Sequence, residues 1–295
     1  MTGVAGEERS GPLLEPALLA RLEALQLGTR RRLAGHFAGE HRSPRRGSSL
    51  DFADYRSYVP GDDFRRIDYF LYARLDVLAV KLFEAEDDLH LRLLLDTSAS
   101  MAGGKLLATQ RLAAALGFLA LIRRDPVTIH TFPLDRPAPR FAGRGAVGAL
   151  LDHLGSLEAS GTTPFAAAVA ALLARPGPQA LTVVLSDLLT PEWETALPRL
   201  PARGGDAVVV HVLARDDLVP DLLGDLELID REGTGRLAVS IGPDTATRYR
   251  RRAEAWLDDV AARCRQAGVG YVRFLDDDDL EATLLGSWRR AGVLR

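Results

Sequence analysis

The chain has 295 residues, of which 47% are hydrophobic and 26% charged, a composition typical of a globular protein with at least one large core. Its formal net charge of −3 gives no overall attraction to nucleic acid or to an anionic membrane. The single cysteine, Cys264, excludes a disulfide framework and a cysteine-rich zinc site. It lies in an amphipathic helical pattern, which indicates a thiol in or near the core.

The beginning of the chain does not resemble a signal peptide, because residues 1–12 are polar and glycine-rich. The longest apolar run, 112–122, ends at two arginines and is shorter than the ~20 residues that a membrane span needs. We therefore expect a cytoplasmic protein without a membrane span.

Residues 1–87 are predicted to form an N-terminal extension that is partly helical and partly irregular. Leucines and alanines recur at helical spacing from Leu13 to Leu27, which predicts a helix. The range Arg30–Arg46 then carries six arginines and two histidines against the single acid Glu40. Such a run is typical of a solvated face or loop, with nucleic-acid binding as the alternative.

The range Asp51–Arg74 is dense in acids, arginines and aromatic residues, and neither helical nor strand periodicity dominates in it. Arginine pairs with carboxylates in a fork geometry and stacks on tyrosine, so this composition predicts an ordered polar network. The network is either a structural clasp that holds the segment to the next domain or a binding surface. Its candidate residues are Arg56, Tyr58, Gly61, Asp62, Asp63, Arg65, Asp68 and Arg74.

From residue 88 to the end, apolar strands alternate with helices. Short apolar runs predict strands at 78–83, just before this domain, and at 90–95, 127–132, 180–185, 206–213 and 271–275. Helical patterns cover 106–122, 147–157, 165–173, 193–200, 245–267 and 279–290, and a hairpin is predicted at 226–230 and 236–241. Strands without polar alternation are typical of a buried parallel sheet, so 88–295 is predicted to be a doubly wound, mostly parallel α/β domain.

Three loops of this domain carry oxygen ligands at the point where ligands bind in open α/β sheets. They are Asp96-Thr97-Ser98-Ala99-Ser100 after the first strand, Ser160-Gly161-Thr162-Thr163-Pro164 before a helix, and Ser186-Asp187 after a later strand. This pattern resembles the metal-ion-dependent adhesion site of von Willebrand factor A domains. By that resemblance, the metal ligands would be Asp96, Ser98, Ser100, Thr163 and Asp187, with Thr162 as the alternative threonine.

Magnesium suits such a set, because it is a hard ion that takes about six oxygen ligands and often keeps waters or an outside ligand. Two carboxylates and three hydroxyls would hold the ion and leave one position for an acidic group of a partner. Manganese or calcium are the alternatives.

The upstream segment extends the resemblance. Phe52, Arg56, Tyr58, Gly61-Asp62-Asp63, Arg65, Ile67-Asp68-Tyr69 and Ala73-Arg74, followed by the Asp-x-Ser-x-Ser-Met loop, resemble the domain of unknown function 58 family. The match is close over 47–101; Tyr69 stands where that family more often has tryptophan. The resemblance implies a von Willebrand factor A-like adaptor that works with a MoxR-type AAA+ ATPase, or with a client protein, in protein remodelling or maturation.

Two other functions compete with a binding module. A magnesium site could serve a hydrolase or a phosphoryl-transfer enzyme. The sequence, however, contains no phosphate-binding Gly-x-x-x-x-Gly-Lys loop, no His-Glu-x-x-His and no Gly-x-Ser-x-Gly, so no catalytic residue is assigned. Nucleic-acid binding through Arg30–Arg46 is the third possibility and predicts binding that weakens steeply with salt.

Overall fold

The computed structural model describes residues 12–23, 50–59, 62, 64, 67–85, 90–132, 138–175, 180–203, 205–220, 222–233 and 235–288. The chain divides into two compact units. The larger unit combines 1–37 with 89–295, and the smaller one is 38–88. Each is described by itself.

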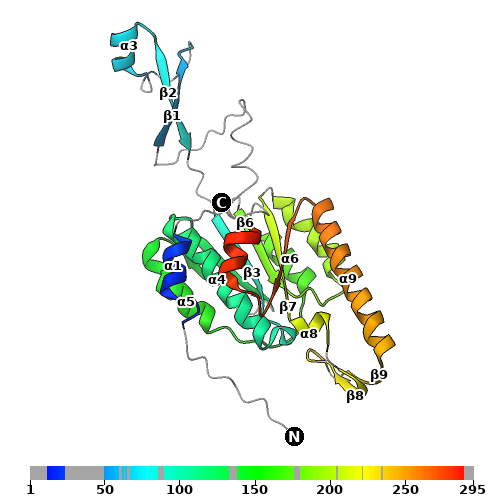
Figure 1. Cartoon of the computed structure of the whole chain (residues 1–295). Helices are drawn as coiled ribbons and strands as arrows, with labels where there is room; N and C mark the ends of the chain where they lie inside the picture. The colour runs from blue at the N-terminus through cyan, green and yellow to red at the C-terminus, as the bar shows by residue number, and fades with distance from the viewer. Residues whose placement is uncertain are drawn as a thin grey trace. The chain divides into compact units, whose positions relative to one another are not determined.

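The larger unit is built on a six-stranded sheet in the order β10-β7-β6-β3-β4-β5 (Figure 1). Neighbouring strands run parallel except β5, which pairs antiparallel with β4 at one edge. The mixed α/β class with a mostly parallel central sheet is therefore confirmed. The strands are β3 (His90–Asp96), β4 (Val127–Phe132), β5 (Arg140–Phe141), β6 (Ala180–Ser186), β7 (Ala207–Leu213) and β10 (Gly270–Leu275).

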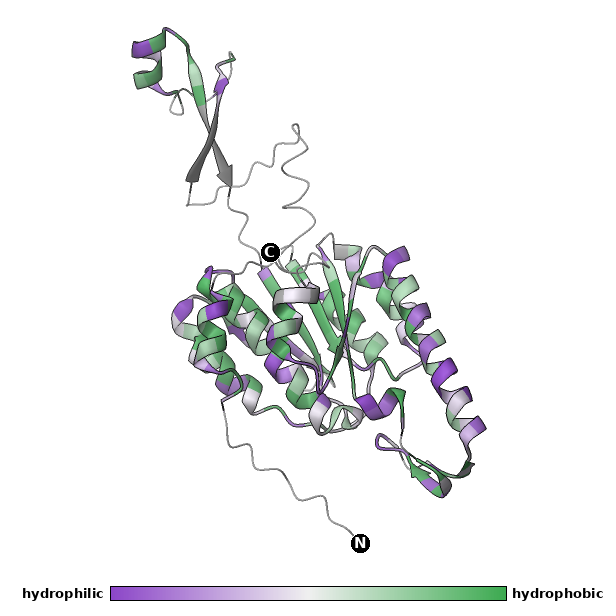
Figure 2. Ribbon diagram, viewed as in Figure 1, coloured by the Kyte–Doolittle hydropathy of each residue, from purple (hydrophilic) through white to green (hydrophobic). Residues whose placement is uncertain are grey.

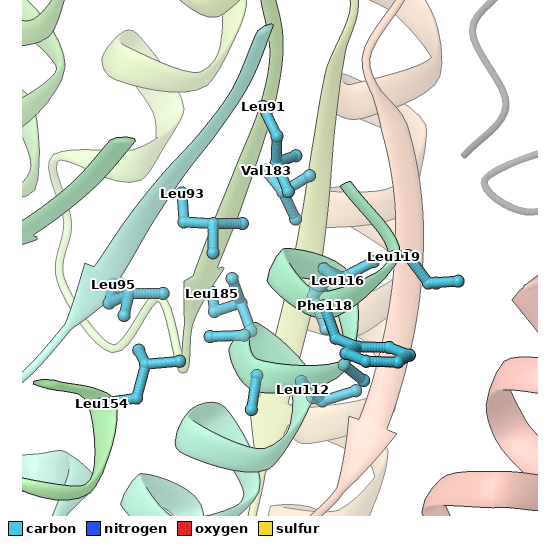
Figure 3. Close-up of a cluster of buried hydrophobic side chains, with 14 of the residues drawn as sticks. Leu91, Leu93, Leu95, Leu112, Leu116, Phe118, Leu119, Leu154, Val183 and Leu185 are labelled. Carbon is cyan, nitrogen blue, oxygen red and sulfur yellow. The ribbon is translucent and has the colours of Figure 1, made fainter. Parts of the chain in front are cut away.

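Helices cover both faces of this sheet, as Figure 1 shows for α4 and α5 on one side and α9 on the other. The first group is α1 (Pro16–Leu22), α4 (Gly104–Ile122) and α5 (Val147–Gly155), and the second is α6 (Phe165–Ala174), α7 (Trp193–Ala196) and α9 (Pro243–Gln266). Successive side chains of β3 divide between the faces: Leu93 and Leu95 pack in the core with α4 (Figure 3), whereas Leu94 belongs to the cluster with α6. Strands that are buried on both faces need apolar residues throughout, which is why these strands lack alternation.

Helix α4 is apolar nearly all round, as its green colour in Figure 2 shows, and almost every side chain in it is buried. Of the described residues, it alone forms a helix long and apolar enough to cross a membrane by length and composition. Its most apolar window is 83% buried inside the unit, as in a core helix, so this likeness to a membrane span is weak evidence.

Helix α1 belongs to the larger unit. Leu14 and Leu22 lie fully or almost fully buried in the core that contains α4. The predicted extension 1–87 therefore includes a helix that packs against the α/β domain. The predicted helix reached Leu27, and residues 24–27 lie outside the described part of the chain. The buried thiol of Cys264 on α9 is confirmed.

The smaller unit corrects the expectation of an irregular segment over Asp51–Arg74. It contains β1 (Leu50–Ser57), which pairs antiparallel with β2 (Ala79–Ala85), and the helix α3 (Tyr69–Leu75). The register of β1 shifts between Phe52 and Asp54, so one face of the strand is not marked by every second residue. This shift hides the strand from a search for alternation.

The remaining elements are short or peripheral. They are the 3₁₀ turns η2 (Ala99–Met101), η3 (Arg144–Ala146) and η4 (Leu197–Arg203), the helices α8 (Arg215–Leu218) and α10 (Leu280–Ala282), the π-helical turn η5 (Thr283–Ser287), and the hairpin strands β8 (Gly224–Ile229) and β9 (Arg236–Ile241). The hairpin confirms the prediction, and the last helix is shorter and less regular than predicted.

Candidate functional site

The three predicted loops meet at the carboxyl edge of the sheet. Strand β3 lies between β4 and β6, so the chain leaves β3 toward one side and returns on the other. The loops that follow β3 and β6 therefore diverge at a topological switch point, where open α/β sheets bind ligands. Asp96 ends β3, and Asp187 directly follows β6.

Asp96 is fully buried at this point. Its Oδ1 accepts hydrogen bonds from the Ser98 hydroxyl (2.6 Å) and the Ser98 backbone N–H (3.0 Å), and its Oδ2 accepts one from the Ser186 hydroxyl (2.6 Å). Burial, and then the negative charge of Asp187, raise the pKa of Asp96 to about 7 against these hydrogen bonds. The hydroxyl oxygen of Ser100 lies 3.0 Å from that of Ser98.

The second loop is tied to the first by backbone hydrogen bonds. The N–H of Ser160 donates to the carbonyl of Thr97 (2.8 Å), and the N–H of Ala99 donates to the carbonyl of Gly161 (3.0 Å). The two threonines of this loop differ in burial: Thr163 is buried, whereas Thr162 is exposed. The loop therefore brings Thr163, rather than Thr162, toward the interior of the site.

Asp187 is fully buried and has an internal cation beside it. The ammonium of Lys105, at the start of α4, lies 2.8 Å from Asp187 Oδ2 and 3.1 Å from Asp217 Oδ2. Burial lowers the pKa of Lys105, but the two carboxylates outweigh it and the pKa is raised. The Leu189 N–H donates to Asp187 Oδ1 (3.1 Å), so both of its carboxylate oxygens have protein partners. His211 supports the same residue with its ring Nε2 2.9 Å from the Asp187 carbonyl oxygen.

A further carboxylate reaches the site from the hairpin β8–β9. Glu232, in the bend, accepts hydrogen bonds from the Thr163 hydroxyl (2.7 Å) and the Thr163 N–H (2.9 Å). Burial raises the pKa of Glu232, but hydrogen bonds from Thr163, Ser100 and Ser98 outweigh it, so the pKa lies below its ordinary value. One carboxylate thus touches two of the three loops.

The donor chemistry at this edge suits a hard cation. The side-chain oxygens gathered there belong to Asp96, Ser98, Ser100, Thr163, Asp187 and Glu232. Carboxylates and hydroxyls are ligands that Mg²⁺ and Ca²⁺ accept. Four carboxylates, those of Asp96, Asp187, Glu232 and Asp217, lie at or beside the site against the ammonium of Lys105, so an added positive charge would be favoured. Across the described ranges no three His, Cys, Asp or Glu side chains are grouped to hold a metal by themselves, so a cation here depends on the hydroxyls as well.

The candidate clasp residues lie in the smaller unit. Arg56 places one Nη within 2.8 and 2.9 Å of the two carboxylate oxygens of Asp62. Asp68 caps α3 by accepting from the Phe70 and Leu71 N–H groups, and it also accepts from the Tyr55 hydroxyl. Among the candidates, these side-chain contacts therefore involve Arg56, Asp62 and Asp68.

Tyr58 pairs through its backbone N–H with the carbonyl of Leu78, and Arg74 is exposed in the last turn of α3. The candidates Gly61, Asp63 and Arg65 lie outside the described residues, as does the run Arg30–Arg46. The choice between a clasp and a binding surface stays a prediction.

Sequence reasoning missed Lys105 and Glu232 as neighbours of the site. Lys105 carried a signal, because Lys81 and Lys105 are the only lysines in a chain with 37 arginines and lysines. A lysine retained at the start of an apolar helix directly after the Asp96 loop indicates a buried ion pair. Glu232 carried no such signal, since its place depends on how the hairpin bends back to the sheet.

The arrangement defines a mixed α/β protein with a polar site at the switch point of a mostly parallel sheet. The model of a family described as "Protein of unknown function DUF58" matches residues 54–258, and the chain belongs to this family. The chain is also 29% identical over 299 residues to the uncharacterized proteins Mb1516 of Mycobacterium bovis and Rv1480 of Mycobacterium tuberculosis. These alignments cover 96% of this chain and 93% of each relative.

Two solved structures are similar over part of the chain. One is the conserved hypothetical protein BatB from Bacteroides thetaiotaomicron, with 14% identity and a TM-score of 0.43. The other is an aerotolerance-related membrane protein from Bacteroides fragilis with multiple mutations to serines, with 17% identity and a TM-score of 0.38. Each alignment covers 69% of this chain and 98% of the other.

Proposed function

We propose that this protein is a von Willebrand factor A-like binding module that presents a divalent cation, magnesium first, to an acidic side chain of a partner protein. The observation that carries the proposal is that three oxygen-bearing loops lie together: Ser98 and Ser186 donate to the fully buried Asp96, and backbone hydrogen bonds tie the second loop to the first. Buried carboxylates are costly unless they are paired or bound to a cation. Burial and the charge of Asp187 raise the pKa of Asp96, so a bound cation would stabilise its charged form.

In this proposal the residues have different roles. Asp96, Ser98 and Ser100 would supply oxygens from the first loop, and Thr163 one from the second. Asp187 would act from the third loop, with Lys105 and His211 fixing its position. Because Lys105 already binds one carboxylate oxygen of Asp187, we expect Asp187 to act on the ion through water. A bound ion would supply a Lewis-acidic centre for an incoming carboxylate.

The proposed partner is a MoxR-type AAA+ ATPase or its client, reached in the cytoplasm, with the protein as adaptor in remodelling or maturation. This part rests on the family resemblance. The sequence assigns no general base or nucleophile to the site, and we therefore propose binding rather than catalysis.

The test of the cation site is thermal or urea unfolding of the full chain with and without magnesium. A ligand that binds only the folded state adds about 2.7 kcal/mol at a free concentration of about 100 times its Kd. Asp96→Asn keeps the shape of the side chain and removes its charge, so it is expected to abolish this gain. Asp152→Asn, on the exposed face of α5, removes the same charge elsewhere and is expected to leave the gain intact. Identical unfolding of the wild type with and without magnesium would reject the site.

The same variants test the partner. The tagged full chain should retain a purified MoxR-type ATPase from the same genome in magnesium and lose it in EDTA. Asp96→Asn should lose the ATPase in both buffers, and Asp152→Asn should behave as the wild type. Retention that is insensitive to EDTA and to Asp96→Asn would reject a cation-mediated contact.

A further inference from the structure

The tip of the hairpin β8–β9 makes polar contacts with the first and second of the three loops that carry the candidate metal ligands. Glu232 accepts two hydrogen bonds from Thr163, at 2.7 and 2.9 Å, and interacts with the hydroxyls of Ser100 and Ser98. Its neighbour Arg231 lies with Nη1 3.4 Å from the carbonyl oxygen of Ala102, just after the first loop. The tip itself is shaped by Asp230, which accepts from the Glu232 N–H (2.9 Å).

The arms of the hairpin contribute little to holding it in place. No side chain of β8 or β9 is buried, and Leu228, Ile229 and Leu237 are exposed. Figure 1 shows the hairpin projecting from the sheet beside α8. Apolar burial therefore contributes little to the stability of the hairpin's position. Among the described residues, the hydrogen bonds of Glu232 are the main contacts between the hairpin and the first two loops.

Glu232 contacts the hydroxyls in a way that leaves them able to bind a cation. A hydroxyl has one proton to donate and two lone pairs to offer. The Thr163 hydroxyl donates its proton to Glu232 Oε1, so its lone pairs stay available. The carboxylate of Glu232 thus sits beside the same oxygens that the cation would use, where its negative charge would favour the ion.

We propose that Glu232 is a tethered internal ligand of the three-loop site, which strengthens cation binding and fills the position that an acidic partner must take. The identity of the ion rests on the proposed function above. A tethered group competes at an effective concentration on the order of millimolar, so a single free carboxylate cannot easily replace it. A partner must therefore bring further contacts, and its binding releases the hairpin tip.

The test compares magnesium affinity by calorimetry in four full-length proteins: wild type, Glu232→Ala, Glu232→Gln and Glu227→Ala. Glu227 is the matched control, because it lies on the same hairpin and pairs with Arg236 of the opposite strand. We expect both Glu232 variants to bind magnesium about tenfold more weakly and Glu227→Ala to match the wild type. Glu232→Gln keeps the size of the side chain and removes only its charge. Weaker magnesium binding by this variant would therefore come from the lost charge and not from a change in the folding of the tip.

Two further readouts test the tether itself. Sodium acetate should restore magnesium affinity to Glu232→Ala, with sodium chloride at equal ionic strength as the control, and should have little effect on the wild type. Magnesium should slow amide hydrogen exchange in 224–241 of the wild type and of Glu227→Ala, but not of Glu232→Ala.

The outcomes separate this inference from the proposed function. If the wild type binds magnesium and the Glu232 variants bind it equally well or more tightly, Glu232 is not a ligand and the inference is overturned while the site stands. If neither the wild type nor any variant binds magnesium, both are overturned. Weaker binding in the Glu232 variants with rescue by acetate supports both.

Discussion

The ion pairs at the two candidate regions of this chain differ in how far they are buried. In the α/β unit, Asp96, Asp187 and Lys105 are buried, and the strands β3 and β6 that lead to the two aspartates are fully buried as well. In the smaller unit, the pair Arg56–Asp62 keeps 34% and 16% of its side-chain surface exposed. Helix α3 of the same unit has no buried residue.

This difference separates two uses of charge. Buried ions need partners with good geometry, because breaking such a pair leaves a desolvated charge that costs about 3–5 kcal/mol. In the α/β unit, Lys105 is such a partner for Asp187, and Ser98 and Ser186 donate hydrogen bonds to Asp96. Exposed pairs contribute only about 0–1 kcal/mol each, so the smaller unit depends on several weak contacts acting together.

The largest expected effect tests whether apolar packing holds the α/β unit. Leu93→Ala removes a fully buried side chain of β3 from the core shown in Figure 3 and should lower the free energy of unfolding by about 2–5 kcal/mol. Leu107→Ala, on an exposed position of α4, is the control and should change it by less than about 0.5 kcal/mol. Urea unfolding followed by circular dichroism measures both. Equal losses would mean that burial does not distinguish the two positions.

Much of the α/β unit could be predicted because burial leaves a direct trace in the sequence. A strand such as β6 is largely apolar because helices cover both of its faces, and its predicted range, 180–185, ends one residue before the strand does in the structure. The approximate place of Asp96, Thr163 and Asp187 also follows from sequence, because parallel strands end at one edge of a sheet. The structure does bring their three loops together.

What could not be predicted depends on tertiary contacts. The irregular register of β1 near Phe52 obscures its periodicity. Helix α3 is apolar or aromatic on nearly every side although none of its residues is buried, so it has no polar face to mark a helical period. The start of α3 does leave a signal in the sequence, because Asp68 precedes Tyr69 and aspartate is favoured as the residue that caps a helix N-terminus. Glu232 is far from the loops in sequence and reaches Thr163 only because the hairpin bends back, which no local pattern encodes.

An intermediate effect tests whether the polar contacts hold the smaller unit. Arg56→Ala removes both contacts with Asp62 and should lower local stability by about 1 kcal/mol, measured as faster amide exchange in β1 and β2. Arg56→Lys keeps the charge but loses the second guanidinium nitrogen, which donates to the Ser57 carbonyl (3.3 Å), so it should recover only part of the loss. If exchange is unchanged while capture of the ATPase fails, the segment is a binding surface rather than a clasp.

The smallest expected effect concerns Phe70, the most exposed aromatic side chain among the residues that the structure describes. Phe70 on α3 is 84% exposed, so Phe70→Ser removes little buried area and replaces one residue with another of similar helix propensity. Amide exchange in 69–85 should change by less than about 0.5 kcal/mol, because Asp68 still caps the helix. A loss above about 1 kcal/mol would mean that Phe70 is covered in solution. The smaller unit would then be held by apolar contact like the larger one, and the contrast between them would fail.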